Sequence, residues 1–292
     1  MIRSRENLGL ALGIAGVLLF GGTLPATRLA VTSFDPLLLT AVRASIAGCA
    51  GLILLVILRR PLPARKLWLD VVVAGLCTIV GFPVLMALAM AQVPAAHGGV
   101  VLGIVPLATA AAAAVVTRER PSLGFWTASA AGAAIVVVFA LHEGGGGFAL
   151  GDLFLAGTVV AGAFGYALSG RLSLAMPGWE AICWQVALFL PLSLLAALLL
   201  WPAHLGNVAA GGWAGLAYVS FVSQFFAFFV FNAAMARIGV ARGGQLMLLQ
   251  PFVIIVLAWP VNGEPIRLET FAYASAVLAA VAIGQRMRVK RR

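Results

Sequence analysis

Apolar runs long enough to cross a lipid bilayer follow one another along almost the whole chain. A bilayer core of about 30 Å requires about 20 apolar residues per helix. Runs of this kind occupy residues 8–31, 37–58, 68–92, 95–116, 123–141, 153–174, 181–201, 213–236, 240–261 and 268–285. Only 10% of the 292 residues are charged, against about 25% in soluble domains. We therefore predict an all-α polytopic membrane protein with ten transmembrane helices.

The first apolar run also has the look of a secretory signal, because Arg3 and Arg5 precede it. Such a signal has an apolar region of about 7–15 residues, whereas this run continues to residue 31. We assign it to the first transmembrane helix.

The distribution of positive charge predicts the orientation of the helices. When successive loops are assigned to alternate sides of the membrane, every Lys and Arg outside the apolar runs falls on one side, with Arg267 as the exception. Cytoplasmic loops carry the excess of Lys and Arg in membrane proteins, so we expect both termini in the cytoplasm. The net charge of +10 then reflects topology, and we expect contact with membrane lipid and no nucleic-acid partner.

A shift of 145 residues places part of the chain over itself. Residues 96–123 align without a gap on residues 241–268, with identical residues at several positions. The matches least expected by chance pair Gly98 with Gly243, Gly99 with Gly244, Pro106 with Pro251 and Glu119 with Glu264. The sequence therefore contains two copies of one unit.

Each copy holds five predicted helices, and an odd number means that the second copy enters the membrane from the opposite side. We expect two inverted repeats around a central cavity: residues 1–143, a glycine-rich external linker at 144–151, and residues 152–292 with a basic cytoplasmic tail. Many secondary transporters are built from inverted repeats, since two similar halves can expose one site to either side in turn.

Helix-breaking residues at three places in the predicted helices bear on the cavity. Pro106 and Pro251 hold equivalent places in the two repeats, and each removes one backbone donor. We expect the helices that carry them to line the cavity, although proline kinks are common in membrane helices. The first helix contains Gly21, Gly22 and Pro25, which predict close packing and a bend at the mouth of the cavity.

Two arginines lie within predicted helices, where a charge is costly. Arg28 is about one turn from the outer end of the first helix, so its side chain can extend to the interface. Arg43 lies about two turns inside the second helix. We expect Arg43 either to cap backbone carbonyls within its own half or to supply positive potential near an anionic group of a substrate.

Polar and aromatic side chains within the apolar runs are candidates for lining a binding site, because pockets are mostly apolar with a few convergent polar groups. At α-helical spacing, residues 218, 225, 229 and 232 share one stripe of the eighth helix. The candidates are Gln92, His97, Tyr166, Gln224, Phe225, Phe229, Asn232, Gln245 and Gln250. Packing against lipid or neighbouring helices is the alternative role for the phenylalanines.

Titratable groups deep in the helices are scarce. Asp35, Asp70, Asp152 and Glu180 fall at helix ends, and we place His142 and His204 in external loops. His97 is then the one obvious proton relay, and it lies near the outer end of its helix. We therefore prefer facilitated, gradient-driven movement to obligate proton antiport.

The chain resembles the drug/metabolite transporter superfamily, EamA type. The resemblance rests on two five-helix halves, on "FGGTLPATRLA" at the end of the first helix, on "DPLLLTAVRASIAG" at the start of the second, and on a proline followed by glutamate in the fourth and ninth. It covers essentially the whole chain and is greatest to bacterial inner-membrane exporters of amino acids, the aromatic amino-acid branch included. It implies a multi-pass protein of the bacterial inner membrane.

The expected function is export of amino acids, aromatic and hydrophobic ones above all, or of similar small metabolites, by alternating access. Alternatives are proton-coupled efflux of drugs or toxic cations, a channel or lipid scramblase, and an intramembrane metalloenzyme using His142, Glu143, Asp152 and His204. No GxxxxGK[ST] loop for an ATP-driven pump occurs. We expect no enzyme activity, no cofactor, no metal, and a monomer or homodimer.

Overall fold

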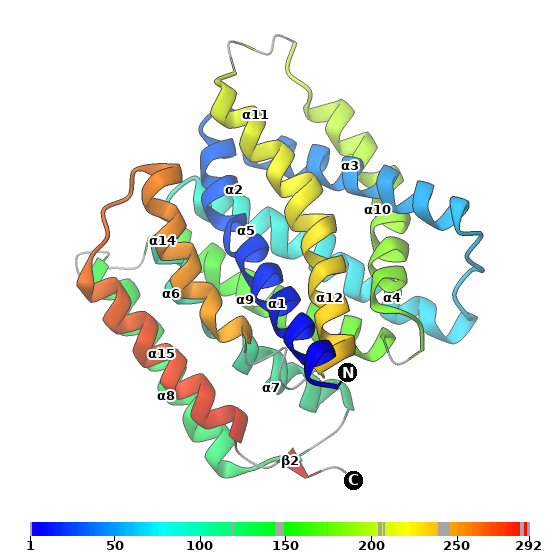
Figure 1. Cartoon of the computed structure of the whole chain (residues 1–292). Coiled ribbons are helices and arrows are strands. Elements are labelled where there is room, and N and C mark those ends of the chain that lie inside the picture. Colours follow the sequence, from blue (N-terminus) through cyan, green and yellow to red (C-terminus); the bar gives the residue numbers. More distant parts are fainter. Residues whose placement is uncertain are drawn as a thin grey trace.

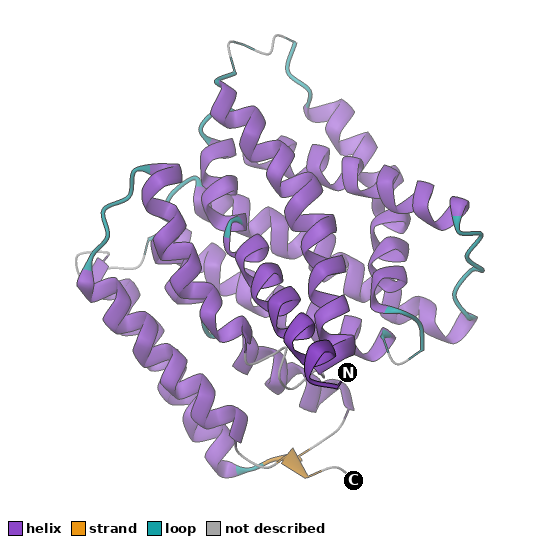
Figure 2. Ribbon diagram, viewed as in Figure 1, coloured by secondary structure: helices purple, strands orange, loops and turns teal. Residues whose placement is uncertain are grey.

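The computed structural model describes residues 2–117, 120–143, 149–173, 175–203, 206, 208–238, 246–286 and 289–290. In these ranges the chain is a bundle of helices (Figures 1 and 2). The exception is a short antiparallel pairing of β1 (Arg120–Pro121) with β2 (Val289–Lys290). The start of α1 (Ile2–Gly21) and strand β2 lie toward the same end of the bundle (Figure 1).

Within the described ranges, eight helical stretches are long and apolar enough to cross a membrane. They are Asn7–Val31, Pro36–Ile57, Arg65–Met90, Ala95–Val116, Leu123–His142, Leu150–Leu172, Gly178–Leu200 and Ala210–Phe231. Two shorter apolar helices follow, Met247–Asn262 and Leu268–Ile283. The protein is therefore a multi-pass, all-helical membrane protein, and these ten stretches overlap the ten predicted ranges.

Four stretches are unbroken α-helices, namely α3 (Pro36–Ile57), α8 (Leu123–Glu143), α9 (Leu150–Leu172) and α10 (Gly178–Leu200). The start of α3 shows how sequence sets a boundary. Pro36 occupies the first turn, where its missing N–H costs nothing, and the Asp35 carboxylate accepts hydrogen bonds from the N–H groups of Leu37 (2.9 Å) and Leu38 (3.1 Å). The final long helix is α15 (Leu268–Arg286).

Two stretches are interrupted near their glycines and prolines. The first divides at Gly22 into α1 and α2 (Thr23–Val31), three residues before Pro25. The fourth divides at Gly103–Ile104 into α6 (Ala95–Leu102) and α7 (Val105–Thr117), directly before Pro106. In the described part of the ninth, a 3-10 turn, η4 (Met247–Leu249), leads into α14 (Gln250–Asn262) with Pro251 in its first turn.

Two other stretches contain π-helical winding. One consists of the 3-10 turn η1 (Arg65–Leu67), α4 (Trp68–Gly75), the π segment η2 (Leu76–Gly81) and α5 (Phe82–Met90). The other consists of α11 (Ala210–Ala217), the π segment η3 (Tyr218–Phe226) and α12 (Ala227–Ile238). The shift of 145 residues carries η2 onto part of η3, so the two copies deviate from α winding at matching places.

Helices related by this shift pack against each other. α3 packs along α10 and α8 along α15, and the pair of α8 and α15 stands at one edge of the bundle (Figure 1). Gly51 permits the approach of α3 to α10, since a Cβ atom there would lie 2.5 Å from Val186 Cγ2. Small residues serve this purpose in membrane bundles, where close packing holds helices together.

Candidate functional site

A cavity of about 360 Å3 lies between the two halves of the chain. Its apolar surface includes Phe20 of α1, Leu102 of α6, Phe228 and Phe231 of α12, and Met247 of η4. Seven polar side chains also line it: Thr78, Thr109, Tyr166, Ser169, Ser173, Gln185 and Gln250. Among the described residues the lining includes no Asp, Glu, His, Lys or Arg. The surface is therefore mostly apolar, with dispersed uncharged polar groups.

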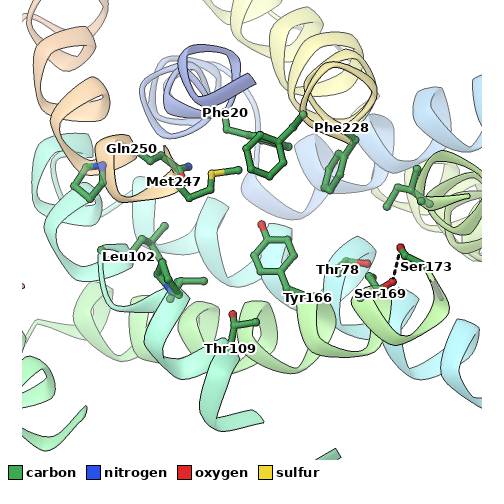
Figure 3. A pocket seen from close by; sticks show the side chains of 18 of the residues that line it. Phe20, Thr78, Leu102, Thr109, Tyr166, Ser169, Ser173, Phe228, Met247 and Gln250 are labelled. Carbon is green, nitrogen blue, oxygen red and sulfur yellow. Dashed lines mark hydrogen bonds between the residues drawn. The ribbon is translucent and has the colours of Figure 1, made fainter. Parts of the chain in front are cut away.

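A hydrogen-bonded cluster forms one wall of the cavity. Gln185 of α10 is fully buried, and its Oε1 lies 2.8 Å from the Thr78 hydroxyl of η2. Its Nε2 donates to the Ser169 hydroxyl of α9 at 3.2 Å. Figure 3 shows Thr78 and Ser169 side by side next to Ser173, which donates to the Ser169 carbonyl. The cluster thus ties three helices together at the cavity surface.

The interrupted helices bring backbone groups to the cavity. Pro106 has no N–H, so the Leu102 carbonyl one turn earlier cannot receive the usual α-helical bond. In the second half Pro251 withholds the same bond from Met247, whose carbonyl instead accepts from the Gln250 N–H through the 3-10 turn. Leu102, Pro106, Met247 and Pro251 all line the cavity. The two helices that we expected to line it therefore do so at their interruptions.

The candidate residues from the sequence divide into two groups. Tyr166 and Gln250 line the cavity, as do Pro106 and Pro251. Gln92 is exposed in the turn after α5, and Gln224 is buried in η3 away from the lining. Gln245 and the side chain of Asn232 lie outside the described residues.

Phe225 and Phe229 of the eighth helix, two of the sequence candidates, do not line this cavity. Phe225 and Phe229 contact each other, with ring centroids 5.1 Å apart, and neither belongs to the cavity lining. Phe228 and Phe231 reach the cavity instead.

Gly21 and Gly22 lie where the first helix passes close to its neighbours. A Cβ atom at Gly21 would lie 2.4 Å from Val253 Cγ1, and one at Gly22 would lie 2.2 Å from the Tyr218 hydroxyl oxygen. Pro25 is buried in α2, and its carbonyl accepts a hydrogen bond from Asn262 Nδ2 at 3.0 Å. These three residues pack the helix and lie outside the cavity lining.

Arg43 of α3 is 6% exposed and is not among the residues that line the cavity. Its guanidinium donates to the Ser223 hydroxyl of η3 at 3.4 Å, and Ser223 is itself 2.8 Å from the Thr23 hydroxyl of α2. Nε has no hydrogen-bond partner in the described part of the chain. Arg43 therefore reaches a side chain of the other half, and no carbonyl cap within its own half is found there.

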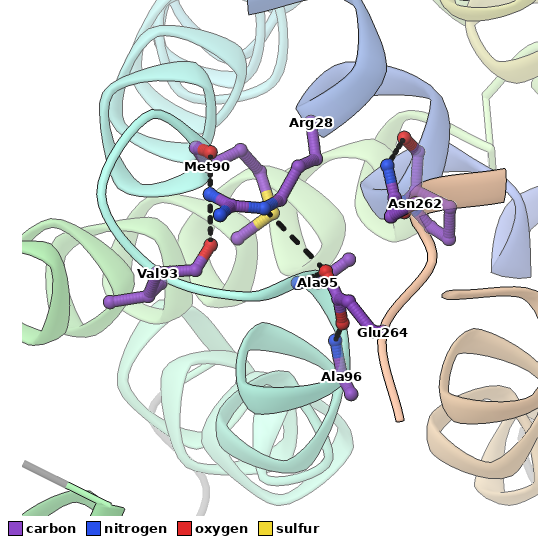
Figure 4. Close-up of polar contacts among 8 residues, drawn as sticks. Arg28, Met90, Val93, Ala95, Ala96, Asn262 and Glu264 are labelled. Carbon is purple, nitrogen blue, oxygen red and sulfur yellow. Dashed lines mark hydrogen bonds and ion pairs between the residues drawn. The ribbon is translucent and has the colours of Figure 1, made fainter. Parts of the chain in front are cut away.

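Arg28 and Glu264 join the two halves at one end of the bundle (Figure 4). Arg28 donates to the carbonyls of Met90 (2.6 Å) and Val93 (2.8 Å), and its Nε lies 3.5 Å from Glu264 Oε1. The Glu264 carboxylate accepts hydrogen bonds from the first N–H groups of α6, those of Ala95 (2.7 Å) and Ala96 (2.9 Å). We call this set, Arg28 and Glu264 with residues 90–96, the clasp.

The clasp differs from the expectation that Arg28 simply extends to the interface. Its side chain is 31% exposed and bonded to protein groups, and the Glu264 side chain is 12% exposed. A carboxylate at a helix N-terminus also interacts favourably with the helix dipole. The repeat equivalent of Glu264 is Glu119, which lies outside the described residues.

His97 is paired with an acidic residue that the sequence placed at a helix end. Its Nε2 lies 2.6 Å from Asp152 Oδ1 in the first turn of α9, and both side chains are buried. Asp152 also accepts from the Ala149 N–H at 2.9 Å and so caps α9. Neither lines the cavity. His97 directly follows Ala95 and Ala96, whose N–H groups donate to Glu264 in the clasp.

The other acidic and histidine residues do not gather. His142 belongs to α8 rather than to a loop, and its Nε2 lies 3.5 Å from Glu269 Oε2 of α15. In the described ranges no three His, Cys, Asp or Glu side chains could hold a metal ion together. His204 and the side chain of Glu143 lie outside the described residues.

Sequence reasoning missed Gln185, Thr78 and Ser169. Gln185 is a lone amide in the apolar run of residues 181–201, and an amide without a partner is as costly there as at the positions we selected. That cost was the available signal for Gln185. The hydroxyls of Thr78 and Ser169 gave no comparable signal, since such groups satisfy themselves within one helix, as Thr78 also does with the Ala74 carbonyl.

The similarity to known proteins extends over almost the whole chain. The model of the EamA-like transporter family matches residues 7–141 and again residues 149–284. The chain is 40% identical to the uncharacterized transporter YdeK of Bacillus subtilis (strain 168), across 94% of this chain and 96% of that protein. It is 24% identical to a second uncharacterized transporter of that organism, YyaM, across 95% and 93%.

A solved crystal structure has the same fold. It superposes with a TM-score of 0.64 at 23% sequence identity, covering 97% of this chain and 99% of that chain.

Proposed function

The chain belongs to the EamA-like transporter family and is a membrane transporter, and from this premise we propose that it is a secondary carrier working by alternating access. The substrates are small amphipathic metabolites, with amino acids, above all aromatic and hydrophobic ones, as the leading class. The direction is export across the bacterial inner membrane.

One observation carries this proposal: the lining of the cavity extends toward one end of the bundle, and the clasp joins the two halves at the other. Lining residues extend to Ser173 and Gly178, which flank the turn between α9 and α10. Glu264, at the opposite end, lies in the turn between α14 and α15 and holds the start of α6. A carrier open to one side needs this asymmetry.

We assign the clasp to the external side and the end of the cavity at Ser173 and Gly178 to the cytoplasmic side. Support comes from the Lys and Arg residues, since Arg171 and Arg237 lie toward the end opposite Glu264 when successive helices alternate in direction. Both termini are then cytoplasmic, and the two repeats are inverted. The packing of α3 on α10 and of α8 on α15 supports a two-fold relation between them.

The lining supports a substrate with an apolar body. Phe20, Phe228 and Phe231 offer aromatic surface, while Gln185, Gln250 and Tyr166 offer hydrogen bonds. A volume of about 360 Å3 lies at the lower end of the range of about 300–1,000 Å3 for small-molecule sites. One amino acid is a suitable occupant for such a space.

Movement down the substrate gradient, without obligate proton exchange, is the proposed energetics. The described lining has no acidic or histidine side chain for a substrate and a proton to compete for. The buried His97–Asp152 pair lies beside the clasp, outside the lining. No cofactor or catalytic step is part of the proposal.

Counterflow in proteoliposomes tests the proposal. Purified protein is reconstituted into vesicles preloaded with unlabelled phenylalanine, and uptake of radiolabelled phenylalanine, leucine, lysine and glutamate is followed. We expect saturable, stereoselective counterflow of phenylalanine or leucine that persists after the pH gradient is collapsed. Flux without saturation or counterflow would indicate a channel or scramblase, and flux abolished by collapse of the gradient would indicate proton antiport.

A further inference from the structure

Arg43 has a buried charge that its surroundings do not satisfy. The side chain lies within the span Pro36–Ile57 and is 6% exposed. A guanidinium offers several N–H donors in a fixed fork and no acceptor. In the described part of the chain its one hydrogen bond is the long one to Ser223, Nε has no partner, and no acidic side chain forms an ion pair with it.

A buried cation of this kind is expensive to retain for structure alone. Charges in membrane spans face a partner, a cavity or a functional ligand, and removing one member of a buried pair leaves a large penalty. Ser223 offers little compensation, because its hydroxyl also lies 2.8 Å from Thr23. The position therefore lacks an anion, and the described protein residues do not supply one.

Tyr166 connects this charge with the cavity. Ala44 and Ala47, which follow Arg43 on α3, pack in one cluster with Ile182 and Phe228 of the cavity lining, so this part of α3 lies behind the cavity wall. Arg43 and Tyr166 are near enough for their charges to influence each other. Tyr166 lines the cavity and is 37% exposed. Figure 3 shows its ring rising from α9, with the hydroxyl directed away from that helix toward the side of the cavity that bears Phe20 and Phe228. In the described ranges, no protein group accepts a hydrogen bond from this hydroxyl.

We propose that Tyr166 and Arg43 form the subsite that recognises a carboxylate on the transported solute. The Tyr166 hydroxyl donates to the carboxylate at the cavity surface, and Arg43 supplies the positive charge behind it. The apolar body of the solute lies against Phe20, Phe228 and Phe231. This inference rests on the proposed carrier function and deepens it by naming the chemical group that the site selects.

The charge also determines what the cavity rejects. The described lining has no acidic side chain, so a solute bearing only a positive charge meets Arg43 without compensation. Like charges placed together without compensation disfavour binding of the wrong partner. The subsite therefore accepts zwitterions and monocarboxylates and excludes organic cations, contrary to an efflux pump for toxic cations.

Three test solutes with the same phenyl body isolate the group that is recognised. The solutes are radiolabelled. Phenylalanine carries both a carboxylate and an ammonium group, 3-phenylpropionate carries the carboxylate alone, and phenethylamine carries the ammonium group alone. In proteoliposomes preloaded with unlabelled phenylalanine, we expect counterflow of the first two, with phenethylamine at least about tenfold slower, equivalent to roughly 1.4 kcal/mol. Phenethylamine flux equal to that of 3-phenylpropionate would overturn the subsite while leaving the carrier intact.

Variants then assign the preference to the two residues. Arg43→Gln removes the charge and is expected to lower 3-phenylpropionate flux about tenfold relative to Arg43→Lys, which retains it. Tyr166→Phe is expected to reduce 3-phenylpropionate flux several-fold. The matched control is Ser45→Ala in the same helix, because Ser45 is buried but bonds only to the Ala41 carbonyl of α3.

The outcomes separate the two proposals. Unchanged discrimination in both Arg43→Gln and Tyr166→Phe, with Ser45→Ala as the reference for folding, would contradict the inference. Absence of counterflow for all three solutes and for the other amino acids tested would contradict the carrier function, and the inference would fall with it. If Arg43→Gln does not fold, the ratio of 3-phenylpropionate flux to phenethylamine flux in the unmodified protein and in Tyr166→Phe still tests the inference.

Discussion

Arg28 and Glu264 meet across the two halves of the chain, with Arg28 Nε 3.5 Å from Glu264 Oε1. Glu264 at the same time accepts the first two N–H groups of α6. One carboxylate therefore holds α2, α6 and the turn after α14 together. If the proposed carrier opens at this end, that carboxylate has to leave its partners.

Glu264→Gln is expected to make the clasp open more readily. Hydrogen bonds to charged groups contribute about 1.5–3 kcal/mol each, and the amide loses the ion pair and part of the helix-terminal stabilisation. In a variant with Cys49, Cys77 and Cys183 replaced and a cysteine introduced by Thr109→Cys, a membrane-impermeant thiol reagent added from outside the cells should react about tenfold faster.

Glu269→Gln is the matched control for this change. Glu269 is also an acidic residue in an ion pair near that end, with His142, but both side chains are more than half exposed. Exposed pairs contribute about 0–1 kcal/mol, so the reaction rate should not change. If the thiol reagent reacts at equal rates in Glu264→Gln and in the protein that keeps Glu264, this contact does not limit opening.

Gln185→Leu is expected to reduce transport about tenfold with little loss of folded protein. The leucine removes the amide that joins Thr78 to Ser169 at the cavity wall, while Thr78 keeps its bond to the Ala74 carbonyl. Initial rates of counterflow measure the effect. Ser275→Ala is the control, since that hydroxyl bonds to its own helix on the exposed face of α15. Full transport activity in Gln185→Leu would contradict a role for this hydrogen-bonded cluster in the binding site.

Gly22→Ala is expected to lower the melting temperature in detergent. Its backbone angles (φ −72°, ψ −8°) suit alanine, so the cost is steric: the new Cβ would lie 2.2 Å from the Tyr218 hydroxyl oxygen. Overpacking of this kind costs about 1–3 kcal/mol. Gly170→Ala is the comparison, because nothing lies within 4 Å of its Cβ position. Equal melting temperatures for the two variants would contradict the close contact.

His97→Gln and Asp152→Asn should each destabilise the protein, and the double variant should cost less than the sum of the two. The groups are buried and 2.6 Å apart, so each single change leaves a buried polar partner unsatisfied. Thermal unfolding of the four proteins measures the coupling. Counterflow by each folded variant should remain independent of the pH gradient; additive losses would mean that the two side chains act separately.

Hydropathy predicted where the helices lie because each span must satisfy its own backbone in lipid. The ten predicted ranges overlap the eight long and two shorter apolar helices. Winding was not predictable in the same way. Nothing in "YVSFVSQFF" marks a π segment, since a local change from i+4 to i+5 bonding depends on packing around η3.

The site was less predictable than the fold. Pro106 and Pro251 were found because proline has a direct backbone effect wherever it occurs. The partners of His97 and Arg28 were not found, because Asp152 and Glu264 lie 55 and 236 residues away from them in the sequence. Contacts of this kind arise only when the halves are packed together.

The π winding of η3 has a consequence for how the cavity wall can change shape. A π turn is an α-helix that has absorbed a surplus residue. Migration of that surplus toward α12 would rotate each side chain it passes by about 100°. Phe228 and Phe231 could then be swung away from the path of a solute by rewinding alone, while the axis of the helix keeps its place among its neighbours.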